Sequence, residues 1–309
     1  MLRGERHPNT TTIDSKHRRR TGAFGTIAQK NAPYFFLLPM IIIFIVFTLY
    51  PLLYSFVLSF QEFNGGKYTF VNLQNYTRLF HDPVFLTALK NTFLYLLIQV
   101  PLMVILSLFI AVLLENKFIR SRAFFRASLF LPSVTALVAY SLVFKLLLNY
   151  DYGIINYLIS HLGFGRVDWL NTSIGAKASI ILAITWRWTG YNMVIMIAGL
   201  QAIPNDLYEA AALDGATAWQ RFWRITVPMM RNIILFVSIT STIGTLQLFD
   251  ESYVLTGGGP NSATITVAHY LYNNAFRYFK FGYAAAISYI MVIIITILSI
   301  IQFYVGKEQ

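Results

Sequence analysis

The amino-acid sequence predicts an all-α polytopic membrane protein with six transmembrane helices. Charged residues make up only 12% of the chain and hydrophobic residues 56%, whereas a soluble domain carries about 25% charged residues. The apolar residues also fall into six blocks, each long enough to cross about 30 Å of hydrocarbon as a helix. The predicted spans are residues 34–60, 91–114, 123–148, 176–200, 232–255 and 281–305.

Four prolines lie within or near the ends of these spans. They are Pro39 and Pro51 in the first span, Pro101 in the second and Pro132 in the third. Proline has no backbone N–H and clashes with the preceding helical turn, so each one predicts a kink. Neighbouring helices and water can satisfy the freed carbonyl groups, which is why membrane helices tolerate proline.

The connections between spans are short. Residues 62–90 and 149–175 contain Asn, Asp, Gly and Trp in patterns suited to small surface helices. The run Gly257-Gly258-Gly259-Pro260 predicts a turn that closes the fifth span. The exception in length is the loop of residues 201–231, which is polar and rich in helix-forming residues.

The net charge of +11 is unevenly distributed along the chain. Of the 24 Lys and Arg residues, 15 lie in the N-terminal tail, in the loops near 116–126 and 201–231 and at the C-terminus, and seven lie in the other loops. The side richer in Lys and Arg is cytoplasmic, so both termini and the 201–231 loop are expected in the cytoplasm. This distribution favours a membrane protein over a nucleic-acid-binding protein.

Two regions follow from this pattern. Residues 1–30 are expected to form a basic, disordered cytoplasmic tail, with a regulatory or lipid-binding arm as the alternative. Residues 31–309 are expected to form a six-span transmembrane domain in the lipid bilayer, including the cytoplasmic loop at about 201–231.

The chain shows no sign of catalytic chemistry of its own. It has no cysteine, which excludes disulfides and thiolate metal sites. It also lacks a Walker A motif for ATP and an HExxH motif for zinc, and its five histidines lie in the tail or in outer regions. We therefore expect a protein that is not an enzyme and that carries no metal or cofactor itself.

The 201–231 loop is expected to contain two short helices. Pro204 begins the first, with Asp206 and Glu209 at capping-box spacing, and Gly215 ends it. A second helix is expected from about Thr217. From the residues alone the loop has two interpretations: a helix that docks on a partner protein, or an amphipathic helix that lies on the inner leaflet.

Residues suited to line a pathway for a polar solute occur in the last three spans, where aromatic faces stand beside neutral polar groups. Ser241, Gly244, Thr245, Leu248 and Ser252 share one helical face, which suits either a pathway or plain helix packing. Arg187 is expected to pair with Asp250 or Glu251, with direct ligand contact as the alternative. The pathway candidates are Trp188, Tyr191, Asn192, Ser241, Gly244, Thr245, Leu248, Asp250, Ser288 and Tyr289.

The loop carries a long gapped motif: Glu209-Ala210-Ala211, then Gly215, then Ile225 with Val227-Pro228. It resembles the EAA loop of ABC importer permeases, with Val227 in place of the usual Leu. Residues 31–305 as a whole resemble the carbohydrate-importing branch of that family, which includes maltose, glycerol-phosphate and arabinan-oligosaccharide permeases. Further matching segments are Ala32-Pro33-Tyr34, Asn72-Leu73-Gln74-Asn75-Tyr76, Gly199-Leu200-Gln201-Ala202-Ile203-Pro204 and Leu255-Thr256-Gly257-Gly258-Gly259-Pro260.

The resemblance implies a type I importer fold and several partners. These are a second homologous permease in a heterodimer, two ATP-binding subunits that carry ATP and Mg, an extracytoplasmic solute-binding protein and a carbohydrate substrate. It places the protein in a bacterial or archaeal cytoplasmic membrane. In such permeases the EAA loop is the coupling helix that docks on the ATPase, so the implied coupling residues are Glu209, Ala210, Ala211, Asp214, Gly215, Ile225 and Pro228.

Three function classes remain open. The first is a sugar or oligosaccharide importer permease. The second is the same machinery for another solute such as glycerol phosphate, which would favour several cations on the pathway. The third is a secondary transporter, which would need ion-coupling carboxylates or broken inverted repeats and has no use for an EAA-like loop.

Overall fold

The computed structural model describes residue 34 and residues 36–115 and 121–307. These residues belong to two compact units that meet in sequence between Tyr54 and Ser55. The first unit contains the π-helical turn η1 (Ile45–Leu49) and the beginning of α2 (Tyr50–Leu58). The predicted tail, residues 1–30, lies outside the described residues.

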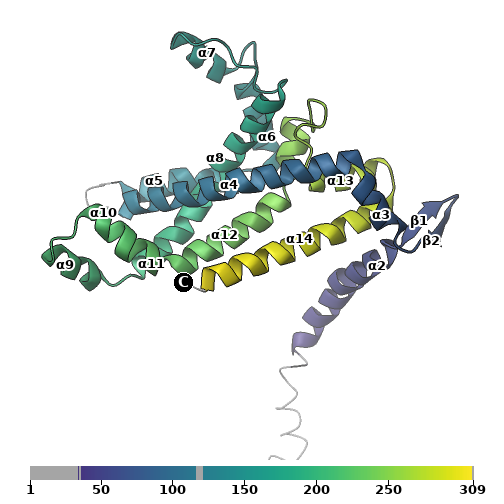
Figure 1. The fold of residues 1–309 in the computed structure, drawn as a ribbon, viewed down its shortest axis with the longest axis horizontal. Helices are drawn as coiled ribbons and strands as arrows, with labels where there is room; N and C mark the ends of the chain where they lie inside the picture. The colour runs from purple at the N-terminus through teal and green to yellow at the C-terminus, as the bar shows by residue number, and fades with distance from the viewer. Residues whose placement is uncertain (1–33, 35, 116–120, 308–309) are drawn as a thin grey trace, which may run out of the picture. The chain divides into compact units, whose positions relative to one another are not determined.

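The second unit is helical apart from one hairpin (Figure 1). Its elements after α2 are β1 (Gln61–Asn64), β2 (Lys67–Phe70), α3 (Gln74–His81), α4 (Pro83–Glu115), α5 (Arg122–Phe130), the 3₁₀ turn η2 (Leu131–Val134), α6 (Leu137–Leu147), α7 (Ile154–His161), α8 (Ser173–Gln201), α9 (Asn205–Leu213), α10 (Ala218–Arg221), η3 (Phe222–Thr226), α11 (Val227–Met229), α12 (Arg231–Leu246), η4 (Glu251–Leu255), α13 (Val267–Tyr272), η5 (Asn273–Arg277) and α14 (Phe281–Lys307).

The predicted membrane spans are present, but two of them are broken. Among the described residues, four helices are long and apolar enough to cross a bilayer: Phe36–Leu58, Pro83–Glu115, Ser173–Gln201 and Phe281–Gly306. Two bent pairs, α5–η2 with α6 and α10–α11 with α12, raise the number to six if each pair is one span. The second span is longer than predicted because its helix continues outward to Pro83.

The third span is not the single helix predicted over residues 123–148. Its two halves meet at 101°, and Pro132 lies in the turn between them, where it supplies no N–H. The hydroxyls of Ser133 and Thr135 donate to the carbonyls of Phe130 and Pro132 at 2.7 and 2.6 Å. These bonds replace part of the lost helical ladder, as a break inside the membrane requires.

The fifth span also ends earlier than predicted. Helix α12 stops at Leu246, nine residues before the predicted end at 255, and the π-helical turn η4 follows. The carbonyl of Leu248, left without a helical partner, accepts a hydrogen bond from Thr266 Oγ1 at 2.6 Å. Ser252 bonds to the carbonyl of Thr264 and to His269 Nδ1, both at 2.8 Å. The segment before α13 therefore stabilises this break.

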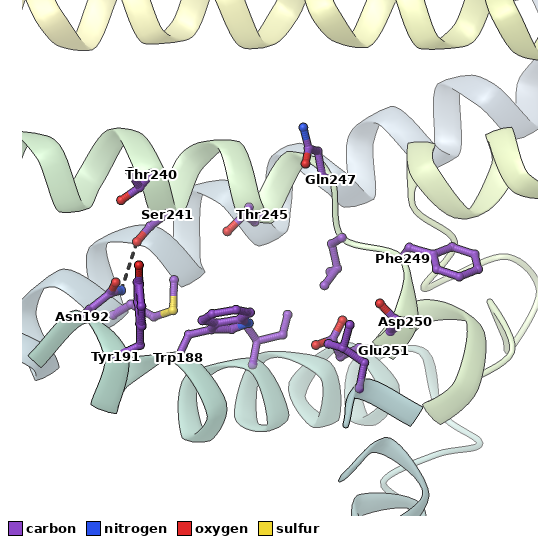
Figure 2. A pocket seen from close by; sticks show the side chains of 15 residues that line it. Trp188, Tyr191, Asn192, Thr240, Ser241, Thr245, Gln247, Phe249, Asp250 and Glu251 are labelled. Carbon is purple, nitrogen blue, oxygen red and sulfur yellow. Dashed lines mark hydrogen bonds between the residues drawn. The ribbon is translucent and has the colours of Figure 1, made fainter. Parts of the chain in front are cut away.

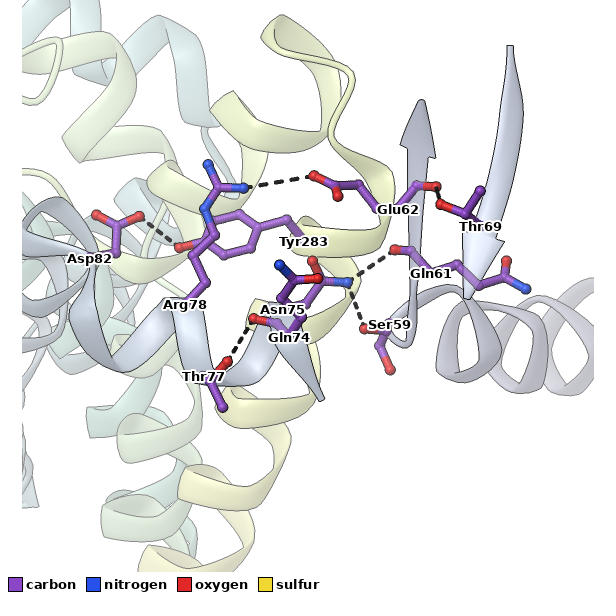
Figure 3. A network of polar contacts seen from close by, with 10 residues as sticks. All are labelled: Ser59, Gln61, Glu62, Thr69, Gln74, Asn75, Thr77, Arg78, Asp82 and Tyr283. Carbon is purple, nitrogen blue, oxygen red and sulfur yellow. Dashed lines mark hydrogen bonds and ion pairs between the residues drawn. The ribbon is translucent and has the colours of Figure 1, made fainter. Parts of the chain in front are cut away.

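The outer region contains a β-hairpin that an all-helical prediction missed. Strands β1 and β2 pair antiparallel, with Gln61 opposite Phe70, and Gly65 and Gly66 form the turn at φ values of +58° and +85°. Asn75 on α3 holds the base of the hairpin by donating to the carbonyls of Ser59 and Gln61 (Figure 3). The predicted small helices are also present, as α3 and α7.

Near the β-hairpin, Asp82 joins α3, α4, α13 and α14. It accepts hydrogen bonds from the hydroxyls of Tyr270 and Tyr283 at 2.5 and 2.6 Å and from the backbone N–H groups of Val84 and Phe85 (Figure 3 shows Asp82 facing Tyr283). Burial acts to raise the pKa of Asp82, but these four bonds outweigh it and hold the pKa below its usual value.

Three buried clusters form the core of the second unit. One lies between α4, α6, α8 and η4, a second between the inner halves of α4, α8 and α12, and a third beneath α3, α13 and α14. Helices α4 and α8 pack against each other along much of their length. Gly190 on α8 permits a close approach to α5, because a Cβ there would lie 1.7 Å from the carbonyl oxygen of Leu129.

Candidate functional site

A cavity of about 470 Å³ lies between α8 and α12. Figure 2 shows side chains of α8 on one side, side chains of α12 on the other, and the break after α12 closing one end. Its lining residues are Met103, Leu137, Ile184, Trp188, Tyr191, Asn192, Thr240, Ser241, Gly244, Thr245, Gln247, Leu248, Phe249, Asp250 and Glu251. The structure thus brings together eight of the ten residues that the sequence suggested for a pathway.

The other two candidates lie elsewhere. The Ser288 hydroxyl donates to the carbonyl of Ala284 one turn earlier in α14. The Tyr289 hydroxyl forms a hydrogen bond with Ser55 Oγ at 3.1 Å, and its ring packs edge-on against Phe56. Neither lines the cavity. Tyr289 instead joins α14 to the part of α2 that belongs to the second unit, whereas the Ser288 hydroxyl is bonded within α14.

The residues predicted to share one face of the fifth span do so only up to the end of α12 at Leu246. Ser241, Gly244 and Thr245 line the cavity from α12, and Leu248 lines it from the break. Ser252 was predicted to share this face, and that is wrong. The residue lies beyond the break, fully buried against the segment that leads into α13.

The cavity combines aromatic rings with neutral hydrogen-bonding groups. The rings of Trp188 and Tyr191 lie edge to face with their centres 5.8 Å apart. Asn192 Nδ2 donates to Ser241 Oγ at 3.1 Å, which links α8 to α12 across the cavity (Figure 2). Gly244 has no atom within 4 Å of where a Cβ would be, so its missing side chain leaves open space.

Arg187 lies behind the cavity, only 4% exposed. Its guanidinium donates to Thr135 Oγ1 and to the carbonyl of Ser133 at 3.3 and 3.4 Å, at the break of the third span. No ion pair within 4 Å joins it to Asp250 or Glu251 in the described chain, so the predicted direct pairing is wrong. The charge of Asp250 nevertheless acts on Arg187 from the cavity wall.

Several residues that line the cavity were not predicted from the sequence. Thr240 lies one helical turn before Gly244, and extending the predicted face by one turn would have found it. Gln247 follows Gly244 by three residues and continues the same face at the end of α12. Phe249 enters the cavity because the helix breaks there, and no pattern in the sequence marked that break. Glu251 was considered as a partner for Arg187 and instead lines the cavity.

The 201–231 loop forms two short helical arms. The first, α9, begins after Pro204 as predicted, but no side chain caps its first turn. The predicted capping box of Asp206 and Glu209 is therefore wrong, since Pro204 occupies the N-cap and Asp206 lies within the first turn of the helix. A capping box forms instead at the second arm, where Thr217 N donates to Gln220 Oε1 at 2.8 Å and Gln220 N donates to Thr217 Oγ1 at 3.2 Å.

The two arms meet at Gly215, as predicted. Its φ is +77°, which favours glycine, and no atom lies within 4 Å of the position that a Cβ would take. The side chain of Leu213, beside this turn, is 90% exposed. Of the predicted coupling residues, Glu209, Ala210, Asp214 and Pro228 are exposed, whereas Ala211 and Ile225 are half-buried.

The loop is attached to the neighbouring ends of the spans. The Tyr208 hydroxyl and Thr226 Oγ1 lie 2.9 Å apart and join the first arm to the second. At the C-terminal end of α4, Glu115 pairs with Arg126 of α5 at 2.5 Å and accepts from Gln201 Nε2, at the end of α8, at 3.0 Å. A displacement at Gln201, where the loop begins, is therefore transmitted to α4, α5 and α8.

Comparisons with known proteins identify the family. The family described as "Binding-protein-dependent transport system inner membrane component" matches residues 83–308. A lactose transport system permease protein of Rhizobium radiobacter is 45% identical over 89% of this chain and 93% of its own length. An arabinooligosaccharides transport system permease protein of Bacillus subtilis is 36% identical over 89% of this chain and 88% of its own.

A solved structure has the same fold. A chain of a bacterial ABC transporter involved in the import of the acidic polysaccharide alginate superposes with a TM-score of 0.79 at 23% identity, covering 92% of this chain and 98% of that one. The likeness shows that the two chains share a fold. The family match over residues 83–308 and the 45% identity to the lactose permease show that the chain belongs to the family of binding-protein-dependent transport system inner membrane components.

Proposed function

We propose that this chain is a transmembrane permease subunit of an ABC importer that moves a sugar or oligosaccharide into the cytoplasm. The observation that carries the proposal is the cavity, in which Trp188 and Tyr191 lie among neutral hydrogen-bonding groups. An aromatic face packs on the C–H surface of a sugar ring, while hydroxyls and amides bond to its hydroxyl groups. The names of the lactose and arabinooligosaccharide relatives support the same cargo class.

The alternative cargo, a phosphorylated or otherwise anionic solute, fits the cavity less well. None of its 15 lining residues is Lys or Arg, and two of them are the carboxylates Asp250 and Glu251. A pathway for an anion would present cations or helix N-termini instead. The carboxylates favour an uncharged sugar.

Transport is coupled to ATP hydrolysis on partner subunits through the 201–231 loop. Small exposed residues at α9 let a partner surface approach closely, and the exposed carboxylate of Glu209 can accept hydrogen bonds from an arginine. The attachment of the loop to α4, α5 and α8 through Glu115 supports this role, because force on the loop reaches the helix that lines the cavity.

The remaining partners follow from the family and from the charge pattern. The complete importer contains a second, homologous permease, two ATP-binding subunits and an extracytoplasmic solute-binding protein. Both chain termini and the 201–231 loop are cytoplasmic, on the side richer in Lys and Arg. The cavity is one wall of a pathway that the second permease completes.

The test is sugar-stimulated ATPase activity of the complex purified through this subunit. The complex is reconstituted with its binding protein and screened against neutral and acidic oligosaccharides. We expect stimulation by a neutral sugar, reduced at least tenfold by Trp188→Ala, while Trp169→Ala in the outer loop serves as the matched control. Stimulation by acidic sugars alone would overturn the cargo proposal, and absence of any co-purifying ATPase would overturn the importer itself.

A further inference from the structure

The two arms of the 201–231 loop carry opposite charge. Residues 205–216 contain Asp206, Glu209 and Asp214 and no basic residue. Residues 217–231 contain three arginines, at positions 221, 224 and 231, and no acidic residue. The division falls at Gly215, the turn between the arms. Because the two arms carry opposite charge, we expect them to contact two different partners.

The basic arm also presents aromatic rings to the outside. Trp219 and Trp223 are 69% and 51% exposed, and their ring centres lie 5.6 Å apart. Phe222 touches both rings and packs inward against the buried cluster at the inner ends of α4, α8 and α12. The two indoles are therefore held by the core while their outer faces remain uncovered in this chain.

The direction of the arm adds a third observation. The helical run Ala218–Met229 makes an angle of 67° with α12. Membrane helices tilt by about 20° from the bilayer normal on average. With α12 at that tilt, the arm runs closer to the plane of the membrane than to its normal, at the cytoplasmic end of the span. Figure 1 shows α10 and α11 at the same end of the second unit as α9 and the C-terminus.

We propose that the segment Trp219–Arg224 lies in the headgroup region of the inner leaflet and binds anionic lipid. Indole rings prefer this depth because one part of the ring is apolar and the N–H is polar. The exposed Arg224 guanidinium then contacts lipid phosphates. The inference rests on the proposed coupling role of the loop: the acidic arm faces the ATPase, while the basic arm holds the turn at Gly215 at a fixed distance from the membrane surface.

The absence of cysteine from the chain gives a direct test, because a single introduced cysteine is unique in it. Nitroxide labels are attached at Trp223→Cys and, as the matched exposed apolar position, at Leu213→Cys. The permease pair is placed in nanodiscs of 30% phosphatidylglycerol in phosphatidylcholine. We expect the label at 223 to collide mainly with oxygen dissolved in lipid, and the label at 213 to collide mainly with a water-soluble nickel complex.

Addition of cysteine-free ATPase subunits separates this proposal from the coupling role. The label at 213 should then lose its access to nickel, and the label at 223 should keep its lipid environment. A label at 223 that is open to nickel before the addition and shielded after it would show that the ATPase covers the aromatic segment, which overturns the proposal. Failure of the ATPase to bind would overturn the coupling role alone, since the lipid measurement precedes it.

The charge is tested separately in the assembled importer. ATPase stimulation is compared between nanodiscs with 30% phosphatidylglycerol and nanodiscs of phosphatidylcholine alone, for the wild type, Arg224→Gln and Arg166→Gln, an equal charge change in the outer loop. We expect an at least threefold dependence on anionic lipid in the wild type and in the Arg166 variant, reduced in the Arg224 variant. Equal dependence in all three would overturn the assignment of Arg224 to lipid phosphate.

Discussion

Gly215 offers the sharpest test of the coupling loop, because its replacement changes a turn and nothing else. At φ +77° an L residue pays about 1–2 kcal/mol for the left-handed conformation, and asparagine pays less than a β-branched residue. No atom lies within 4 Å of the new Cβ, so overpacking contributes nothing. Gly215→Val should therefore cost about 1–2 kcal/mol at the turn, which lowers the equilibrium constant for forming the correct turn roughly 5–30-fold.

The assay compares Gly215→Val with Gly215→Asn. Both variants should reach the membrane in wild-type amounts, measured by immunoblot of membrane fractions, because the cost is local and the spans are untouched. Sugar uptake and sugar-stimulated ATPase activity should fall at least fivefold in the valine variant and stay close to wild type in the asparagine variant. Equal activity of the two would refute the argument that the conformation of this turn matters for coupling.

Three further predictions concern packing and the outer end of the unit. Gly190→Ala places a Cβ 1.7 Å from the carbonyl oxygen of Leu129, so α5 and α8 must separate. We expect the free energy of unfolding to fall by about 3 kcal/mol, measured as a lower Tm of the purified complex. The control is Gly244→Ala, where no atom lies within 4 Å of the new Cβ, and it should leave Tm unchanged. Asp82→Asn keeps the oxygen that accepts from the helix start but removes the charge to which the Tyr270 and Tyr283 hydroxyls donate, and should lower stability by about 1–2 kcal/mol in the same measurement. Burial, and to a lesser degree the nearby Arg277, lowers the pKa of His269 to about 4. Because the folded protein keeps this imidazole neutral while the unfolded chain protonates near pH 6.5, stability should fall by up to ~3 kcal/mol as the pH drops from 6.5 to 4. A His269→Gln variant should lack this part of the pH dependence of Tm.

The sequence was sufficient to predict the spans because hydrocarbon imposes one rule on every residue within it. A block of about 20 apolar residues must satisfy its own backbone groups, and a helix does so regardless of what surrounds it. The ends of α8 and α14 accordingly lie within three residues of the predicted ends. The turn at Gly215 was also predictable, because a glycine between two helical patterns marks a positive φ.

The two broken spans could not be located from the sequence in the same way. Pro132 predicted a kink, but a turn of 101° depends on Arg187, which donates to the break from a helix about 50 residues later. The end of α12 at Leu246 depends on Thr266, whose hydroxyl donates to the carbonyl of Leu248 across 18 residues, a contact that no local pattern indicates. Hydropathy cannot distinguish a continuous helix from a broken one when tertiary hydrogen bonds satisfy the break.

These breaks explain why the cavity was predicted only in part. Trp188, Tyr191 and Asn192 were recognised because they combine aromatic and amide groups within a regular helix. The break after α12 brings Phe249 into the same cavity, and no helical periodicity places it there. The β-hairpin was missed for a related reason: it has only four residues in each strand, too few for an alternating pattern to stand out.

Helix α8 connects the parts of the site mechanically. Its side chains Trp188 and Tyr191 line the cavity, while Arg187, beside them, donates to the break of the third span. Its inner end, Gln201, bonds to Glu115 at the base of the loop. A helix of 29 residues is stiff along its axis, whereas the two breaks are the points where the neighbouring spans can bend. Movement of the loop would therefore be transmitted along α8 and would change the cavity at the two breaks, where the backbone depends on a few hydrogen bonds between side chains and carbonyls.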